Sequence, residues 1–148
     1  PWKNPRSINN GLNLYSEPVQ DRLYAIVVDV ARGVGGDYSA FVVFDVTQMP
    51  YHVVATYKNN NIPPMLYPQV IYNTAKHFKE ALVLVEVNDI GQQVADILYH
   101  DFEYENILST RSMGRGGQQI GPRVLGFLVK MKFTEDCKWT SLQNNPEW

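Results

Sequence analysis

The hydrophobic pattern divides the chain into short apolar runs that are separated by turns. The first run, from Leu23 to Val28, is nearly all apolar and ends at Asp29. A continuous run of this length is typical of a strand that is buried on both faces. Residues 39–46 and 51–57 predict a second and a third strand. The short turns between these strands predict an antiparallel meander.

The pattern then changes to helical spacing. Apolar residues recur at helical intervals between Leu66 and Phe78, which predicts an amphipathic helix. Residues 81–87 are again almost all apolar and predict another buried strand. A second helix follows, with its apolar stripe over residues 94–98, and residues 106–108 predict a fifth, short strand.

The predicted order is three strands, a helix, a strand, a helix and a strand. This order gives an α/β fold, in which a three-stranded antiparallel meander is extended by parallel strands into a mixed sheet with flanking helices. Residues 1–20 mix Pro, Asn, Ser and Gly without periodicity and predict a linker. The folded domain is predicted over residues 21–121. Residues 122–148 show no clear period, so we expect the C-terminal part of the fold to be incomplete or atypical.

Composition and charge exclude some functions. The 148 residues carry a net charge of −2, so affinity for nucleic acid cannot rest on one broad basic face. A carboxylate site remains compatible with this charge, because such a site is acidic until cations bind. No apolar run reaches the ~18 residues of a membrane span. The chain begins with Pro1, and we expect it to be a fragment of a longer protein.

Two acidic residues occupy equivalent places in the predicted sheet. Asp29 ends the first strand, and Glu86 lies near the end of the fourth. If these strands are neighbours, their carboxylates converge at one end of the sheet, where a divalent cation is a natural partner. Mg²⁺ prefers such oxygen ligands, and two ions about 4 Å apart can assist phosphodiester hydrolysis. The alternative is that each acid simply marks the start of a polar loop.

A glycine-rich turn separates the first two predicted strands. Gly33, Gly35 and Gly36 are expected to adopt positive φ angles and to leave room for a phosphate or a metal ion. Asp37 lies eight residues beyond Asp29 and returns close to it across the hairpin. Asp37 is therefore either an additional ligand or water-orienting acid, or a cap of the turn.

Three arginines are candidates for contacts with DNA. Arg32 lies in the glycine-rich turn, and Arg111 and Arg115 lie in a predicted flexible basic loop over residues 111–119. Each is equally compatible with a solvated loop position. Asp89 is expected to cap the second helix. The sequence contains no zinc-ligand pattern, no Ser-His-Asp arrangement and no nucleotide phosphate loop.

Two segments, AIVVDVARGVGGDYSA at 25–40 and VEVNDIG at 85–91, resemble the nuclease domain of the large terminase subunit of myoviruses, most closely cyanophage versions. The resemblance covers about residues 20–121. It implies an RNase H-like fold that cuts concatemeric double-stranded DNA with Mg²⁺ or Mn²⁺ held by three carboxylates. It makes Asp29 and Glu86 the first two metal ligands, and Asp37 an accessory catalytic acid.

The resemblance also implies partners and a place of action. The partners are the ATPase motor domain of the same subunit, the portal and the small terminase subunit; the place is the procapsid in the host cytoplasm, with no membrane. The third carboxylate of the family lies in a C-terminal helix. Beyond Glu105 this chain offers only Glu135, Asp136 and Glu147, none in a comparable setting. We therefore expect weak or absent nuclease activity.

Three other interpretations remain. The main one is an RNase H-like module that binds DNA, a motor or a portal without cutting. An actin-like or sugar-kinase ATPase also has a strand, an acid and a glycine turn, but it needs a second domain for which the chain has no room. A Holliday-junction resolvase shares the fold and the metals, but such an enzyme is expected to be more basic and dimeric.

Overall fold

The predicted meander forms the middle of a larger sheet. The computed structural model describes residues 5–9, 11–87, 90–113, 119–127, 132–133 and 139–140. Within these residues, six strands form a sheet in the order β1-β2-β5-β4-β3-β6. The strands are β1 (Arg6–Asn9), β2 (Leu12–Leu14), β3 (Tyr24–Asp29), β4 (Ser39–Asp45), β5 (His52–Asn59) and β6 (Leu82–Val85).

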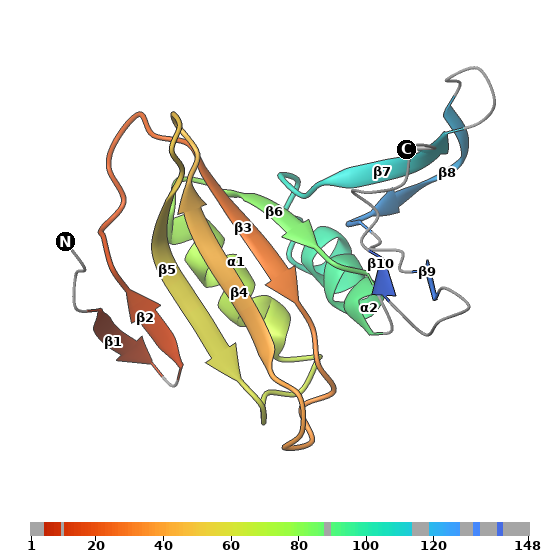
Figure 1. Ribbon diagram of the computed structural model, residues 1–148, viewed down its shortest axis with the longest axis horizontal. Coiled ribbons are helices and arrows are strands. Elements are labelled where there is room, and N and C mark those ends of the chain that lie inside the picture. Colours follow the sequence, from red (N-terminus) through yellow and green to blue (C-terminus); the bar gives the residue numbers. More distant parts are fainter. Residues whose placement is uncertain are drawn as a thin grey trace.

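The strand directions agree with the prediction of a mixed sheet. β4 pairs antiparallel with β3 on one side and with β5 on the other. The chain then crosses over through helix α1 (Tyr67–His77) and returns as β6, which pairs parallel with β3 (Figure 1). Parallel neighbours require a long crossover of this kind, usually through a helix. The predicted α/β arrangement is therefore confirmed.

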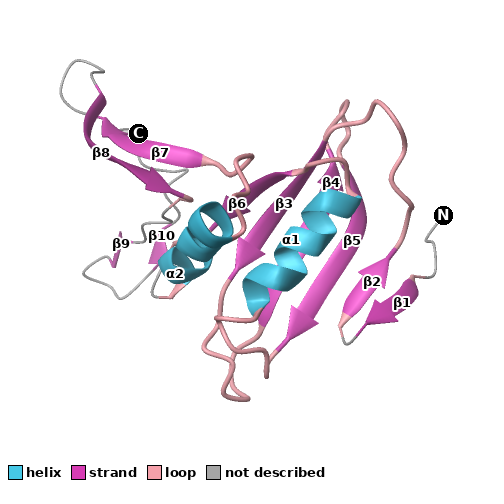
Figure 2. Cartoon of the chain, turned by 180° about the vertical axis from the view of Figure 1, so that it is seen from behind, coloured by secondary structure: helices cyan, strands magenta, loops and turns pink. Residues whose placement is uncertain are grey.

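One face of the sheet holds the core. Ile26 and Val28 of β3 are completely buried. α1 lies over this face (Figure 2) and adds Tyr67, Ile71 and Ala75 to the same apolar cluster. A second helix, α2 (Gly91–Asp96), continues into a π-helical turn, η1 (Ile97–Asp101), and covers the same face beside α1 (Figure 2).

The other side of the sheet, which we call the open face, is only partly buried. Val27 of β3 is 39% exposed. The open face contains two apolar rows that run across three strands: Leu82, Ala25 and Phe44 in one, and Leu84, Val27 and Val42 in the next. Both described helices lie on the opposite face (Figure 2). The prediction that the first strand is buried on both faces is therefore wrong within the described residues.

A β-bulge interrupts β5. Val43 of β4 pairs with Ala55, whereas its neighbour Phe44 pairs with Val53, so Val54 is passed over in the register. Val54 and Ala55 are both buried as a result. A bulge of this kind adds one residue to one strand and increases the local twist.

Part of the predicted linker belongs to the sheet, so the prediction of a linker is wrong for β1 and β2. β1 and β2 form a hairpin, and β2 pairs antiparallel with β5. Leu14 is opposite Ala55 and only 5% exposed, so it is part of the core. Strands of three and four residues are too short to show a period, which is why the sequence pattern indicated a linker.

Two segments extend the sheet beyond β6, and a hairpin leaves it between them. Ile107 forms a parallel bridge with Val83, in agreement with the predicted fifth strand, and Phe127 forms one with Glu86. The hairpin consists of β7 (Ser109–Met113) and β8 (Gln119–Leu125) and projects away from the sheet (Figure 1). The short strands β9 (Lys132–Phe133) and β10 (Trp139–Thr140) pair antiparallel.

Two further predictions disagree with the hairpin of β7 and β8. Arg111 lies in β7 rather than in a flexible loop, and the predicted boundary at residue 121 falls inside β8. Arg115 lies outside the described residues. The bridge between Phe127 and Glu86, the residue directly after β6, shows that the sheet edge includes a residue beyond 121. Among the described residues, no helix is long and apolar enough to cross a bilayer.

The hairpin of β1 and β2 should contribute measurably to stability. We expect Leu14→Ala to lower the free energy of unfolding by about 2 to 3 kcal/mol, because it removes a buried side chain at the edge of the core. The control is Leu23→Ala, since Leu23 is 66% exposed and its loss should change stability by less than about 0.5 kcal/mol. Urea unfolding measures both values. Equal, small effects would mean that the hairpin is dispensable.

Candidate functional site

Asp29 and Glu86 are neighbours across the parallel pair of strands. Val28 pairs with Val85, and the Glu86 amide donates a hydrogen bond of 3.0 Å to the Val28 carbonyl. The next positions in this register are Asp29 and Glu86. Because side chains alternate along a strand, both carboxylates lie on the side opposite the buried Val28 and Val85. The structure therefore places these two predicted residues together at one end of the open face.

The two carboxylates differ in their access to solvent. Asp29 is exposed, and Glu86 is partly buried and has further interactions of its own. On the open face they follow directly after the apolar row that contains Leu84 and Val27. An acidic pair thus lies between an apolar surface and solvent, where a hydrated cation can reach it.

The glycine-rich turn after β3 is held by specific contacts. The Ala31 amide donates to the Ser39 hydroxyl at 2.9 Å, and the Gly35 amide donates to the Asn60 carbonyl at 2.9 Å. Gly33 has φ +72°, and a Cβ at this position would lie 2.2 Å from the Ile62 carbonyl oxygen. The turn is therefore fixed both to β4 and to the loop after β5.

The predicted positive φ angles hold for two of the three glycines. Gly33 and Gly35 have φ values of +72° and +84°. Gly36 does not have a positive φ, and a Cβ there would meet no atom within 4 Å. The prediction is wrong for Gly36, because the left-handed conformation needed to reverse the chain is already supplied by the two glycines before it.

A hollow of about 490 Å³ lies over this turn. Its lining includes Asp29, Arg32, Asp37 and Tyr38. The structure thus brings Asp37 to the same hollow as Asp29, as expected from the hairpin, and Arg32 lines this hollow too. Glu86 is adjacent through its strand register but is not part of this lining.

The acids do not form a complete ligand set in the described part of the chain. Among those residues, no group of three His, Cys, Asp or Glu side chains is arranged to hold a metal ion. Asp89, the predicted cap of α2, lies outside the described residues. Two carboxylates side by side still suit a partly hydrated Mg²⁺, which is commonly held by one or two carboxylates together with waters.

Gly91 fixes the start of α2 against the end of β6, a role that no local sequence pattern indicated. Gly91 is buried, and a Cβ on it would lie 2.0 Å from the Glu86 carbonyl oxygen. Only a glycine permits this approach of helix and strand. The backbone of Glu86 is therefore confined between β3 on one side and α2 on the other.

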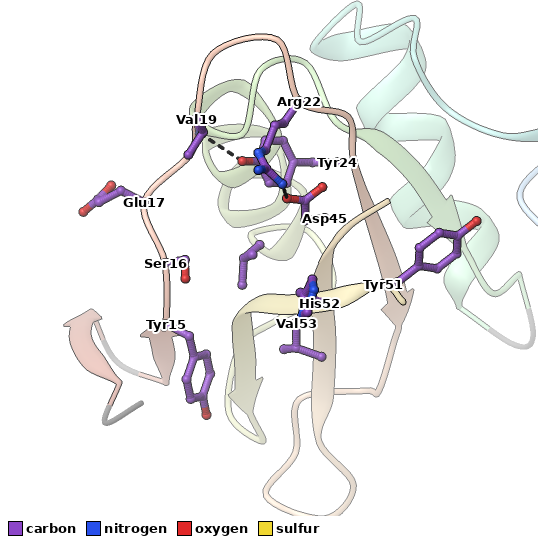
Figure 3. A pocket seen from close by; sticks show the side chains of 11 residues that line it. Tyr15, Ser16, Glu17, Val19, Arg22, Tyr24, Asp45, Tyr51, His52 and Val53 are labelled. Carbon is purple, nitrogen blue, oxygen red and sulfur yellow. Dashed lines mark hydrogen bonds and ion pairs between the residues drawn. The ribbon is translucent and has the colours of Figure 1, made fainter. Parts of the chain in front are cut away.

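A larger hollow, of about 810 Å³, lies at the other end of the sheet (Figure 3). Asp45 lines it and pairs in register with Tyr24, the first residue of β3. Asp45 accepts hydrogen bonds from Arg22 at 2.9 Å and from the Thr47 hydroxyl at 2.6 Å. Its carboxylate is thus already satisfied within the chain, and most of the remaining lining is aromatic or aliphatic. This hollow is distant from the acidic pair.

Burial and hydrogen bonding shift the pKa values of Asp45 and Tyr67 in opposite directions. Burial raises the pKa of Asp45, but hydrogen bonds from Thr47 and Arg22 outweigh it, so the pKa lies below the ordinary value of 3.8. Burial, then Tyr57 and then Asp29 raise the pKa of the Tyr67 hydroxyl well above its ordinary value. Tyr67 therefore stays neutral beneath the sheet, and Asp45 stays charged.

Comparison with known proteins gives the same fold. Residues 26–140 match the family described as "Terminase RNaseH-like domain". The large terminase nuclease of thermophilic phage G20c with bound cobalt is similar, with 17% identity and a TM-score of 0.57 over 68% of this chain and 50% of that one. The magnesium-bound form of the same nuclease has 16% identity and a TM-score of 0.57 over 69% and 51% of the two chains.

These likenesses confirm the predicted RNase H-like fold. The chain spans about half the length of the solved chains that it matches, 50% to 56% in the cobalt, zinc and magnesium structures. The match of residues 26–140 also extends beyond the predicted boundary at residue 121.

The glycine turn offers a matched pair of substitutions. We expect Gly33→Ala to cost at least about 1 to 2 kcal/mol of unfolding free energy, because alanine is strained at positive φ and its Cβ would meet the Ile62 carbonyl. Gly36→Ala should change stability by less than about 1 kcal/mol, because its surroundings are open. Chemical unfolding of both variants tests this difference, and a costly Gly36→Ala would contradict it.

The ion pair of Asp45 should make stability depend on pH. Because the pKa of Asp45 is lowered on folding, its contribution is present above the unfolded pKa and is lost as pH falls through the folded pKa. We expect Asp45→Asn to lose about 1 to 3 kcal/mol at neutral pH and to approach the unmodified chain in acid, below 3.8. Asp101→Asn, at an exposed position, is the control. A deficit that persists in acid would show that geometry, not charge, is responsible.

Proposed function

This chain belongs to the terminase RNase H-like domain family, and from that membership we propose that it is the metal-dependent endonuclease domain of a phage DNA-packaging terminase. Its substrate is concatemeric double-stranded viral DNA, and its reaction is hydrolysis of a phosphodiester bond. The observation that carries the proposal is the register of β3 and β6, which makes Asp29 and Glu86 neighbours on one face of the sheet.

In this proposal Asp29 and Glu86 are the metal ligands. Their carboxylates supply hard oxygen donors, and the chain around them limits their movement: β3 and α2 confine the Glu86 backbone, and pairing with β4 fixes Asp29. Mg²⁺ or Mn²⁺, as a single ion or a pair, would supply Lewis-acid stabilisation of the phosphate and a more acidic water. G20c terminase nuclease structures with bound cobalt, zinc and magnesium support a divalent cation in general.

The glycine turn has a supporting role in the same reaction. Asp37 lines the hollow with Asp29 and is suited to accept a proton from, or orient, a water there. Arg32 lines the same hollow and carries a positive charge suited to a phosphate oxygen. Arg111 of β7 and Arg115 are proposed to contact the DNA backbone as well.

The proposal also places the chain in a larger assembly. Its partners are double-stranded DNA, the ATPase motor domain of the same subunit, the portal and the small terminase subunit. It acts in the cytoplasm of the infected host, at the procapsid. Because the chain spans about half of the solved nucleases that it matches, these partners are proposed for the whole protein.

A second candidate is a module that binds DNA or the motor without cutting it. This alternative is favoured by one observation: the described residues contain no group of three metal-ligating side chains. The two proposals differ in the role of the acids. A non-cutting module should bind no Mn²⁺ between Asp29 and Glu86, and its affinity for DNA should not change in Asp29→Asn.

The metal site is tested directly by titration with Mn²⁺. We expect the unmodified chain to bind Mn²⁺, and Asp29→Asn and Glu86→Gln each to weaken binding at least about tenfold, since each removes one anionic ligand. Glu105→Gln, at an exposed position, should bind as the unmodified chain does. Calorimetry gives the affinity, and paramagnetic broadening of NMR signals locates the ion. Equal binding by all four proteins would remove the basis of the proposal.

We expect the chain to cleave DNA slowly even if it binds Mn²⁺. With two carboxylates where the family resemblance implies three, we expect slow or undetectable nicking of plasmid DNA in Mn²⁺. Agarose electrophoresis of supercoiled plasmid measures it. Rapid cleavage that disappears in Asp29→Asn would contradict this expectation and show that the site is complete.

A further inference from the structure

Lys58 lies in the same row of the open face as the two carboxylates. Ala40 of β4 pairs with Asp29 on one side and with Lys58 of β5 on the other. Glu86, Asp29, Ala40 and Lys58 therefore occupy successive positions across four strands. Two strand spacings separate Asp29 from Lys58, which puts their Cα atoms about 10 Å apart.

Both ends of Lys58 are held in place. Its amide donates a hydrogen bond of 3.1 Å to the Gly11 carbonyl, while its ammonium lies 4.1 Å from the centre of the Tyr38 ring. Tyr38 is 45% exposed and lines the hollow that contains Asp29. A neutral ring attracts the ammonium without cancelling its charge, so the cation remains available to an external anion.

We propose that Lys58, held by Tyr38, binds a backbone phosphate of the DNA at a distance from the bond that is cut. The inference rests on the proposed function in one respect, namely that DNA is the ligand. It goes further by assigning a phosphate contact to the open face, on the meander side of the acids. Tyr38 is a positioning residue, because it acts through Lys58.

The geometry favours a phosphate other than the scissile one. Phosphates along one strand of duplex DNA repeat every 3.4 Å or so of helix axis. A lysine whose Cα lies about 10 Å from the Cα of Asp29 is therefore suited to a phosphate a few nucleotides away. Such a contact fixes the register of the duplex over the carboxylates, which is the usual role of phosphate contacts.

The charge of the chain makes a single cation near the acids important for DNA binding. The chain has a net charge of −2, and the carboxylates repel DNA unless cations are bound. Affinity must then come from individual cations at the rim of the acidic site. Lys58 is two strands away from Asp29, and its ammonium lies over the ring of Tyr38, which lines the same hollow as Asp29, so it is placed for this role.

The test is the salt dependence of DNA binding. We compare Lys58→Gln with the unmodified residue in an Asp29→Asn background, in EDTA, on a short labelled duplex, so that neither cleavage nor metal binding enters the measurement. K is the association constant, and log K falls as log salt rises. One lost phosphate contact should make this slope less steep by about 0.9 and should lower K about eightfold at 0.1 M salt. Lys58→Arg keeps the charge and should keep both values.

Lys76→Gln is the matched control, because it makes the same chemical change on α1, on the other face of the sheet. It should leave the slope unchanged. Tyr38→Leu should lower K by about two- to fivefold and keep the slope, since the charge remains but is less well placed. Circular dichroism checks that each variant is folded.

The outcomes separate this inference from the proposed function. Equal effects of Lys58→Gln and Lys76→Gln, or a Lys58→Arg variant as weak as Lys58→Gln, would overturn the contact even if Mn²⁺ binds between the acids. Failure of the parent protein to bind the duplex would overturn it as well. If Lys58→Gln makes the salt dependence less steep but the chain binds no Mn²⁺, the phosphate contact is supported and the proposed metal site is not.

Discussion

The parallel pairing of β3 with β6 is the constraint on which the candidate site depends. The pairing is specified by two buried rows, in which Ile26 faces Val83 and Val28 faces Val85. A slip of one residue would replace Val83 and Val85 in the core by the larger Leu82 and Leu84, and would turn Glu86 toward the core. The hydrophobic core therefore fixes the register, and the register in turn brings the acidic pair together. The packing of the core and the position of the two acids therefore depend on the same strand register.

The sequence predicted the elements whose patterns are long. The apolar runs ending at Asp29 and Glu86 and the helical spacing over α1 were sufficient to predict a mixed sheet and a shared position for the two acids. The hairpin of β1 and β2 was missed because its strands are short and its stability comes from β5, far away in the sequence. Burial on both faces of β3 was predicted wrongly, because an apolar run alone cannot show how many layers cover it.

The site residues that escaped the sequence analysis depend on contacts between distant segments. Gly91 matters because α2 passes close to the Glu86 carbonyl, which no local pattern indicates. Lys58 becomes informative only once two strand pairings place it in the row of Asp29. Both cases show that the residues around a carboxylate pair are determined by register and close packing, whereas the carboxylates themselves follow from strand-terminal position.

The bulge at Val54 has a consequence for the two sides of β5. Before the bulge, the odd-numbered Val53 faces outward. After the bulge, the even-numbered Thr56 and Lys58 face outward, because the extra residue shifts the alternation of inner and outer side chains by one position. Tyr57 is thereby turned inward, where its ring stacks on Phe41. Loss of a single residue at this point would not merely shorten the strand. It would exchange its inner and outer residues, burying a lysine and expelling a tyrosine.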